Sequence, residues 1–120
     1  MLQSLPSPYH LHYRRRLHQE AQYRQDRYRL AWRDSRRAAA LLRRKFAVKG
    51  VWLFGSTLSC QFFHETSDLD LAVWGLPLKD YCSAVGELLF EIEDFSIDLV
   101  RLEEAQASLR QAILVDGFQL

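Results

Sequence analysis

Residues 51–74 read VWLFGSTLSCQFFHETSDLDLAVW, two short apolar runs on either side of a polar loop. The runs cover residues 51–54 and 69–74, and each has the length of a buried β-strand rather than a helix. The first run ends in Gly55-Ser56, a pair typical of a turn. The stretch therefore predicts two strands joined by a polar loop, and the rest of the chain is expected to pack around them.

Two aspartates, Asp68 and Asp70, stand at the start of the second run. Side chains alternate across a strand with a period of two, so both carboxylates are expected on one face and Leu69 and Leu71 on the other, in the core. Two carboxylates at one spot repel each other unless a cation lies between them. Mg²⁺ suits such a site, because it keeps several waters and is completed by substrate phosphates.

The Gly-Ser turn provides the other half of this expected site. Gly55 can take a positive φ and lets the backbone approach a ligand closely. A short helix beginning near Ser56 would present free N–H groups that favour a phosphate. Together with the aspartates, the turn predicts a site for a metal-bound nucleoside triphosphate.

The motifs FGS, SDLDLAV and FSIDLV, read in this order, resemble the minimal nucleotidyltransferases of the DNA polymerase β superfamily. The resemblance runs from Val51 to the C-terminus, including Gly117-Phe118. It implies an α+β nucleotidyltransferase fold, with a small mixed β-sheet flanked by helices. It also implies catalytic and metal-binding roles for three aspartates and nucleotide binding by a glycine and two serines: Asp68, Asp70 and Asp98, and Gly55, Ser56 and Ser67. Asp98 would hold a second Mg²⁺ nearest the acceptor hydroxyl and act as its base.

The sequence departs from the family pattern after the Gly-Ser pair. Eleven residues, 57–67, separate Ser56 from Asp68, one more than the usual spacing. The arginine and glycine that usually follow Gly-Ser are replaced in the run 57–60, which reads TLSC. Without the resemblance, the two aspartates could also be loop residues, and Ser67 could merely close a turn. His64 is read as an exposed loop residue rather than a base.

Length and composition indicate one soluble domain. The chain has 120 residues, of which 48% are hydrophobic and 26% charged, ordinary values for a globular protein. No apolar run approaches the roughly 20 residues that span a bilayer, so no membrane contact is expected. Cys60 and Cys82 suit neither a disulfide framework nor a zinc site. We therefore expect reduced thiols and a cytoplasmic protein.

Charge is distributed very unevenly. Residues 1–50 hold 13 Lys or Arg and 3 Asp or Glu, a net charge of +10, whereas residues 51–120 hold 3 and 12, a net charge of −9. This asymmetry predicts an acidic or polyanionic partner for the first half, or attraction between copies of the chain.

The basic half is expected to be helical. Residues 1–8 predict an irregular lead-in, residues 9–49 a long Arg-rich helical arm, and residues 50–120 the nucleotidyltransferase core. An apolar stripe in the second half of the arm indicates packing on the core, and Gly50 is placed to end the helix. The first half is expected to project, or to break away as a separate helix near residues 19–26.

The remaining segments complete the α+β pattern. A helix is expected to follow the turn at residues 75–77 and to reach about Glu93, with an apolar stripe that includes Leu89. A strand is expected over residues 95–102. Asp98 within this strand would be costly if the strand is central, but would face water if the strand is at an edge. A further helix is expected from Glu103-Glu104, followed by a short final strand at Phe118.

Function follows from the resemblance. Minimal proteins of this family are typically antitoxins paired with HEPN ribonuclease toxins, and are thought to transfer AMP from Mg-ATP to a toxin tyrosine. We therefore predict a Mg²⁺-dependent protein adenylyltransferase with a HEPN toxin and ATP as partners. One alternative is an antitoxin of the same fold that neutralises by binding alone. Others are an RNA-associated protein that uses the basic arm, although no RNA-binding motif is present, and, more distantly, antibiotic nucleotidyl transfer. Homo-oligomerisation through the N-terminal helix is also possible.

Overall fold

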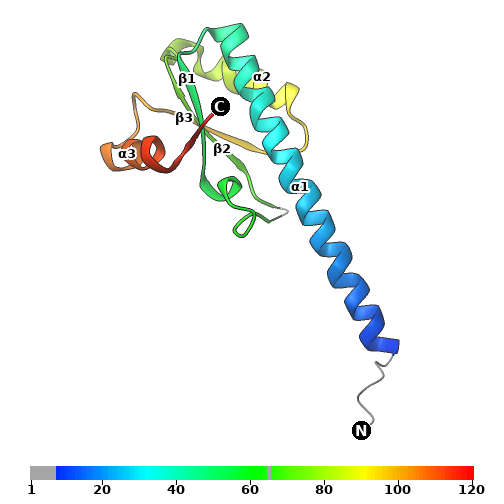
Figure 1. Ribbon diagram of the computed structural model, residues 1–120. Coiled ribbons are helices and arrows are strands. Elements are labelled where there is room, and N and C mark those ends of the chain that lie inside the picture. The colour runs from blue at the N-terminus through cyan, green and yellow to red at the C-terminus, as the bar shows by residue number, and fades with distance from the viewer. Residues whose placement is uncertain (1–7, 65) are drawn as a thin grey trace.

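One mixed β-sheet organises the chain in the computed structural model, which describes residues 8–64 and 66–120. The order of its strands is β3-β2-β1-β4. Figure 1 shows the sheet beside one very long helix, α1, with α2 and α3 at either side. The elements follow in the order α1 (Pro8–Phe46), β1 (Gly50–Phe54), β2 (Leu69–Trp74), α2 (Tyr81–Glu91), β3 (Ile97–Arg101), α3 (Ala107–Asp116) and β4 (Phe118–Gln119). The α+β class and the mixed sheet predicted from the sequence are confirmed.

The strand register places the functional candidates at one end of the sheet. β1 pairs antiparallel with β2, and Phe54 lies opposite Asp70. β3 runs parallel to β2, so that Asp70 is also the register partner of Asp98. β4 closes the other edge against β1, with Gln119 opposite Trp52. The end of β1 and the beginnings of β2 and β3 therefore meet at the same edge of the sheet.

The two faces of the sheet are covered unequally. The larger core lies on the face that α1 and α2 cover, and Leu69 and Leu71 of β2 are fully buried in it, as predicted. On the other face, Ala72 packs with Leu102 and with Ile113 of α3 in a much smaller cluster. Because side chains alternate along β2, Asp70 shares this second face with Ala72. The smaller cluster includes Ala72 but not the aspartates.

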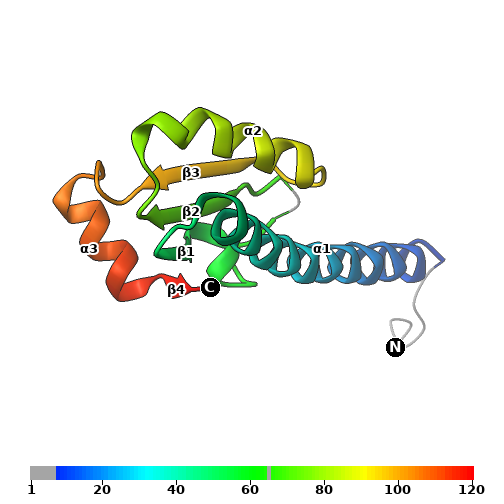
Figure 2. The ribbon, with the colours of Figure 1, turned by 90° about the horizontal axis from the view of Figure 1, so that it is seen from above.

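Helix α1 continues without a break from Pro8 to Phe46. Side chains 10–26 are all exposed, and burial begins at Arg27. Figures 1 and 2 show this first part projecting from the body as a straight arm. Of the two courses predicted for residues 9–27, the projecting helix is the one observed. The lead-in predicted for residues 1–8 lies outside the described residues except for Pro8, which begins the helix.

The predicted end of the helix at Gly50 is wrong. The helix stops at Phe46, and Ala47 takes the left-handed conformation with φ 53°. Gly50 is instead the first residue of β1, where a Cβ atom would lie 2.6 Å from the ring of Trp52. A glycine is required there by the packing of the Trp52 indole and not by a helix end.

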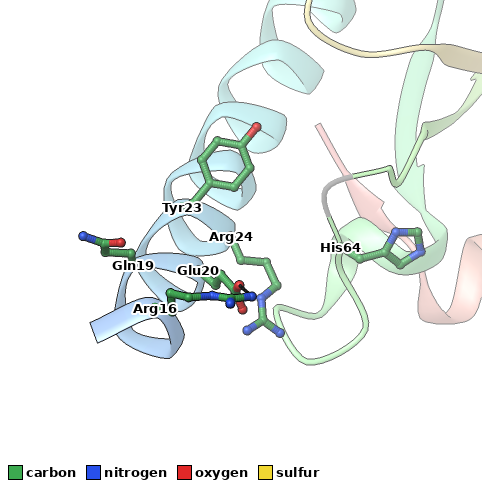
Figure 3. Close-up of a pocket in the computed structure, with 6 residues that line it drawn as sticks. All are labelled: Arg16, Gln19, Glu20, Tyr23, Arg24 and His64. Atoms are coloured by element: carbon green, nitrogen blue, oxygen red, sulfur yellow. Dashed lines mark ion pairs between the residues drawn. The ribbon is translucent and has the colours of Figure 1, made fainter. Parts of the chain in front are cut away.

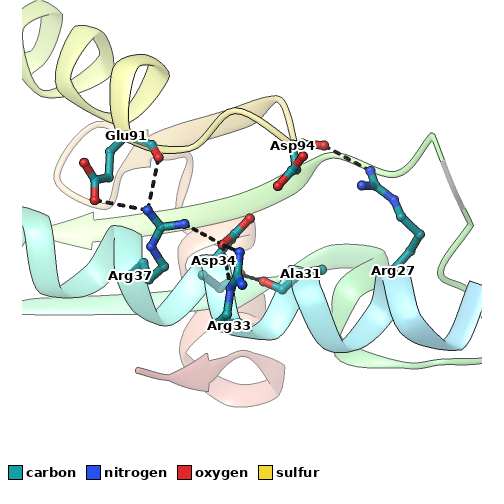
Figure 4. A network of polar contacts seen from close by, with 8 residues as sticks. Arg27, Ala31, Arg33, Asp34, Arg37, Glu91 and Asp94 are labelled. Carbon is teal, nitrogen blue, oxygen red and sulfur yellow. Dashed lines mark hydrogen bonds and ion pairs between the residues drawn. The ribbon is translucent and has the colours of Figure 1, made fainter.

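A buried aspartate ties α1 to the end of α2 (Figure 4). Asp34 is completely buried, and its Oδ1 accepts hydrogen bonds from Arg33 and Arg37. Arg37 also donates to the Glu91 carboxylate at 3.1 Å. Two turns before Asp34, Arg27 donates to the carbonyl oxygen of Asp94 at 3.0 Å. This network fixes the helix where it leaves the body.

Two helices differ in detail from the prediction. Leu89 of α2 is 62% exposed, and Ala84 is buried in the core instead. The last helix begins at Ala107 rather than at Glu103-Glu104, because the backbone N–H of Glu104 closes a turn on Arg101. The Glu103 carboxylate accepts the Gly75 N–H at 2.8 Å. Over residues 8–64 and 66–120, none of the helices has the length and apolarity that a membrane span needs.

Candidate nucleotidyl-transfer site

The candidate site lies at the open end of the sheet, on the face that carries Ala72. Asp70 occupies its centre, with Phe54 of β1 on one side and Asp98 of β3 on the other. β3 is an edge strand, and Asp98 is exposed. The edge alternative from the sequence is thus the observed one, and the Asp98 carboxylate needs no buried partner. Asp68, immediately before β2, is exposed as well.

The surroundings of Asp70 disfavour the ionised form of its carboxyl. Burial raises the pKa of its carboxyl above the ordinary value, and the negative charges of Asp98 and Asp68 raise it further. The carboxylates of Asp98 and Asp68 are thus each close enough to Asp70 to repel its charge in a partly buried environment. A cation near Asp70, as expected from the Asp-x-Asp pattern, would relieve this repulsion.

Gly55 is required by the position of the Asp70 carboxylate. Its φ is +81°, a conformation that favours glycine, and a Cβ atom there would lie 2.2 Å from Oδ2 of Asp70. The glycine therefore lets the turn after β1 lie directly against the carboxylate. Ser56 follows in a single 3₁₀ turn, Gly55–Leu58.

Hydrogen bonds join this turn to the loop before β2. The Ser56 hydroxyl donates to the Oγ of Ser67 at 3.2 Å, and the backbone N–H of His64 donates to the same oxygen at 3.0 Å. Ser67 is buried and also closes a turn with its own N–H on the His64 carbonyl. Its turn-closing role is therefore observed. Nucleotide binding by Gly55, Ser56 and Ser67 stays a prediction.

The residues present fit a magnesium ion that substrate completes. Within the described parts of the chain, no three His, Cys, Asp or Glu side chains form a metal cage by themselves. Mg²⁺ is commonly held by one or two carboxylates, with waters and substrate phosphates filling the other positions. Asp70 and the carboxylates that repel it, Asp98 and Asp68, are the donors available for such an ion.

Sequence reasoning missed two residues that shape the site. Thr57 is fully buried, and its hydroxyl lies 3.5 Å from the carbonyl oxygen of Asp68, which supports the start of β2. Tyr81 donates its hydroxyl to the carbonyl oxygen of Leu99 at 2.6 Å, and burial followed by the charge of Asp98 raises the pKa of this phenol. Thr57 stands where the family pattern has another residue type, and Tyr81 is part of an apolar helical stripe. Neither sequence position indicated a polar role.

Comparison with protein families agrees with this geometry. The model of the family described as polymerase beta, nucleotidyltransferase, matches residues 37–120. The chain belongs to this nucleotidyltransferase family. The match begins inside α1, so the projecting arm lies outside it. No curated protein gives a significant match.

Three solved structures of similar proteins come from toxin-antitoxin complexes. The toxin-antitoxin MntA-HepT structure is 26% identical, with a TM-score of 0.54 over 72% of this chain and 68% of the other. A toxin-antitoxin structure with AMP-PNP is 28% identical, with a TM-score of 0.56 over 69% of each chain. A mutant of the MntA-HpeT complex is 30% identical, with a TM-score of 0.55 over 68% of this chain and 66% of the other.

Proposed function

We propose that this nucleotidyltransferase is an antitoxin that transfers AMP from Mg-ATP to a hydroxyl, preferably of tyrosine, on a partner HEPN ribonuclease toxin and so neutralises it. The observation that carries the proposal is the gathering of Asp68 and Asp98 around Asp70 beside the Gly55-Ser56 turn. The similarity to toxin-antitoxin structures, one of them with AMP-PNP, supports both the nucleotide and the kind of partner.

The chain's own residues have distinct parts in this reaction. The turn at Gly55 and Ser56 binds the β and γ phosphates, and Asp98 accepts the proton of the acceptor hydroxyl. The hydroxyl oxygen forms a bond to the α phosphorus, while the bond from that phosphorus to the β-phosphate oxygen breaks. AMP is then esterified to the toxin, and pyrophosphate leaves. Asp68, Asp70 and Asp98 would hold Mg²⁺, which neutralises charge on the attacking and leaving oxygens.

ATP that carries a radioactive label on one chosen phosphate tests this proposal directly. ATP labelled at the α phosphate should transfer label to the purified toxin in the presence of Mg²⁺, whereas ATP labelled at the γ phosphate should not, because pyrophosphate leaves. Label from the γ position on the toxin would indicate phosphoryl transfer and would overturn the proposal.

One observation favours an antitoxin that acts by binding alone. The run 57–60, TLSC, lacks the arginine and glycine that usually follow Gly-Ser, and Thr57 is buried under Asp68. The double variant Asp68→Ala, Asp70→Ala separates the two functions, with toxin ribonuclease activity as the readout. Full neutralisation by this variant would support binding alone, and lost neutralisation with a folded variant would support transfer.

A further inference from the structure

The projecting arm and the site loop face each other across a cleft of about 660 Å³ (Figure 3). Five of its lining residues come from α1 and one from the loop before β2: Arg16, Gln19, Glu20, Tyr23, Arg24 and His64. The family match begins only at residue 37, so the arm wall of this cleft is an addition to the shared nucleotidyltransferase core.

The arm wall is the unpartnered continuation of the helix face that packs on the body. Glu20, Arg24, Arg27 and Ala31 follow one another at steps of three and four, so they lie along one side of α1. Ala31 is fully buried against the sheet, and Arg27 contacts Asp94 and lies 4.2 Å from the centre of the Phe95 ring. Closer to the N-terminus of α1, the same helix face lines the cleft instead of packing on the core.

The cleft is lined by two arginine side chains and one tyrosine ring, those of Arg16, Arg24 and Tyr23. Arg16 approaches Glu20 at 3.9 Å, but the two side chains are 65% and 60% exposed, so this pair contributes little. Arg24 belongs to none of the ion pairs found among residues 8–64 and 66–120. Tyr23 is 52% exposed. An exposed guanidinium group binds a carboxylate with two parallel hydrogen bonds, and tyrosine and arginine are the residue types enriched where proteins bind partners.

The wall of the cleft opposite the arm is linked by hydrogen bonds to the candidate site. The His64 N–H donates to the Ser67 Oγ, which also accepts the hydroxyl hydrogen of Ser56. A ligand that contacts His64 in the cleft therefore touches the loop that leads directly to Asp68. The cleft therefore borders the loop that ends at the candidate site.

We propose that this cleft docks an acidic segment of the protein acceptor, so that Arg16 and Arg24 bind its carboxylates and hold the acceptor at the site. The inference rests on the proposed transfer to a toxin. An acidic protein segment fits better than nucleic acid because stacking platforms usually present several large aromatic rings, and Tyr23 is the only Phe, Tyr or Trp among the described residues that line the cleft.

Charge reversal provides the test, with a matched control on the same helix. The cleft variant is Arg16→Glu, Arg24→Glu. The control is Arg14→Glu, Arg15→Glu, which makes the same change of charge at exposed positions that line a different hollow of α1. AMP transfer from Mg-ATP to the purified toxin is followed against toxin concentration, and AMP-PNP binding confirms an intact site in each variant.

The cleft variant should raise KM for the toxin about tenfold while kcat at saturating toxin and the affinity for AMP-PNP change by less than about twofold. The control should leave all three values within about twofold of the unaltered protein. An Arg16→Ala, Arg24→Ala variant should show a smaller rise in KM. Equal effects of both reversals, or no effect of the cleft variant, would overturn the proposal.

Two further outcomes separate this inference from the proposed function. If the unaltered protein transfers no AMP, the proposed function fails, and the cleft is judged by the dissociation constant for the toxin, which only the cleft variant should raise. If a single-stranded RNA of 20 nucleotides competes with the toxin, and the cleft variant alone abolishes RNA binding, the cleft is a nucleic-acid site and the proposal is wrong.

Discussion

At the scale of single residues, the candidate site depends on crowding around the Asp70 carboxylate. Its pKa is raised by burial and by the charges of Asp98 and Asp68, and a Gly55 without Cβ leaves just enough room for it. A partly buried carboxylate that other carboxylates repel destabilises the fold, and such perturbed groups cluster at functional sites. Two substitutions measure these costs separately.

Replacing Asp70 by asparagine should stabilise the protein at neutral pH. Because the folded-state pKa is raised, ionisation of Asp70 costs stability. The cost is absent below the ordinary aspartate pKa of about 3.9 and appears as pH rises through the folded-state pKa. For this partly exposed group, the Asp70→Asn melting temperature at pH 7 should rise by about 1–3 °C, which corresponds to a few tenths of a kcal/mol.

The exposed Glu93→Gln substitution is the control for this measurement, because it removes one negative charge from a residue that is not part of the candidate site. Its melting temperature should hardly change. The gain of Asp70→Asn should also vanish as pH falls below about 3.9. A lower melting temperature for Asp70→Asn at pH 7 would show that the ionised carboxylate makes a stabilising contact instead.

Replacing Gly55 by alanine should damage both stability and transfer. The residue has φ +81°, and the new Cβ would lie 2.2 Å from the Asp70 Oδ2. The conformation alone costs about 1–2 kcal/mol of unfolding free energy, and the displaced carboxylate should lower the rate of AMP transfer at least tenfold. Gly86→Ala is the control, because its Cβ would meet no atom within 4 Å. Equal rates for the two variants would exclude the proposed contact.

At the scale of elements, the sequence predicted most of the sheet. The strand over Leu69–Trp74 has the predicted bounds, and β1 and β3 differ at their ends. Their apolar and β-branched residues make a local signal that survives without tertiary contacts. The helix ends were less predictable because they depend on distant partners, such as the Trp52 ring over Gly50.

The site residues also fall into two groups, those that a local sequence pattern indicates and those that depend on long-range contacts. The Asp-x-Asp pair and the Gly-Ser turn are visible as local patterns. The Ser67 bonds to Ser56 and His64, the support of Asp68 by Thr57 and the position of Asp98 on an edge strand are long-range properties. No spacing rule in a single sequence specifies them.

The network that joins α1 to α2 should be a measurable element of stability. Asp34 is fully buried and accepts hydrogen bonds from two arginines, one of which continues to Glu91. Asp34→Ala should therefore lower the free energy of unfolding by about 1–3 kcal/mol in urea denaturation. Asp26→Ala, an exposed aspartate on the same helix, should change it by less than about 0.5 kcal/mol. An Asp34→Ala variant as stable as Asp26→Ala would exclude a role for the network.

At the scale of the whole molecule, two parts have different relations to the family. The body, covered by the family match from residue 37, carries the carboxylates and the Gly-Ser turn. The arm, residues 10–26, is exposed along its whole length and meets the site loop only across a cleft. We infer that the body performs the proposed transfer of AMP and that the arm selects the acceptor.

The most direct measurement is the intact mass of the proposed partner, a HEPN toxin, after incubation with this protein, ATP and Mg²⁺. If the protein transfers AMP, the mass of the toxin should increase by one or more AMP units, and this increase should disappear with Asp70→Ala. A toxin that forms a tight complex but keeps its original mass would contradict the proposed transfer and leave a binding antitoxin with a nucleotidyltransferase fold.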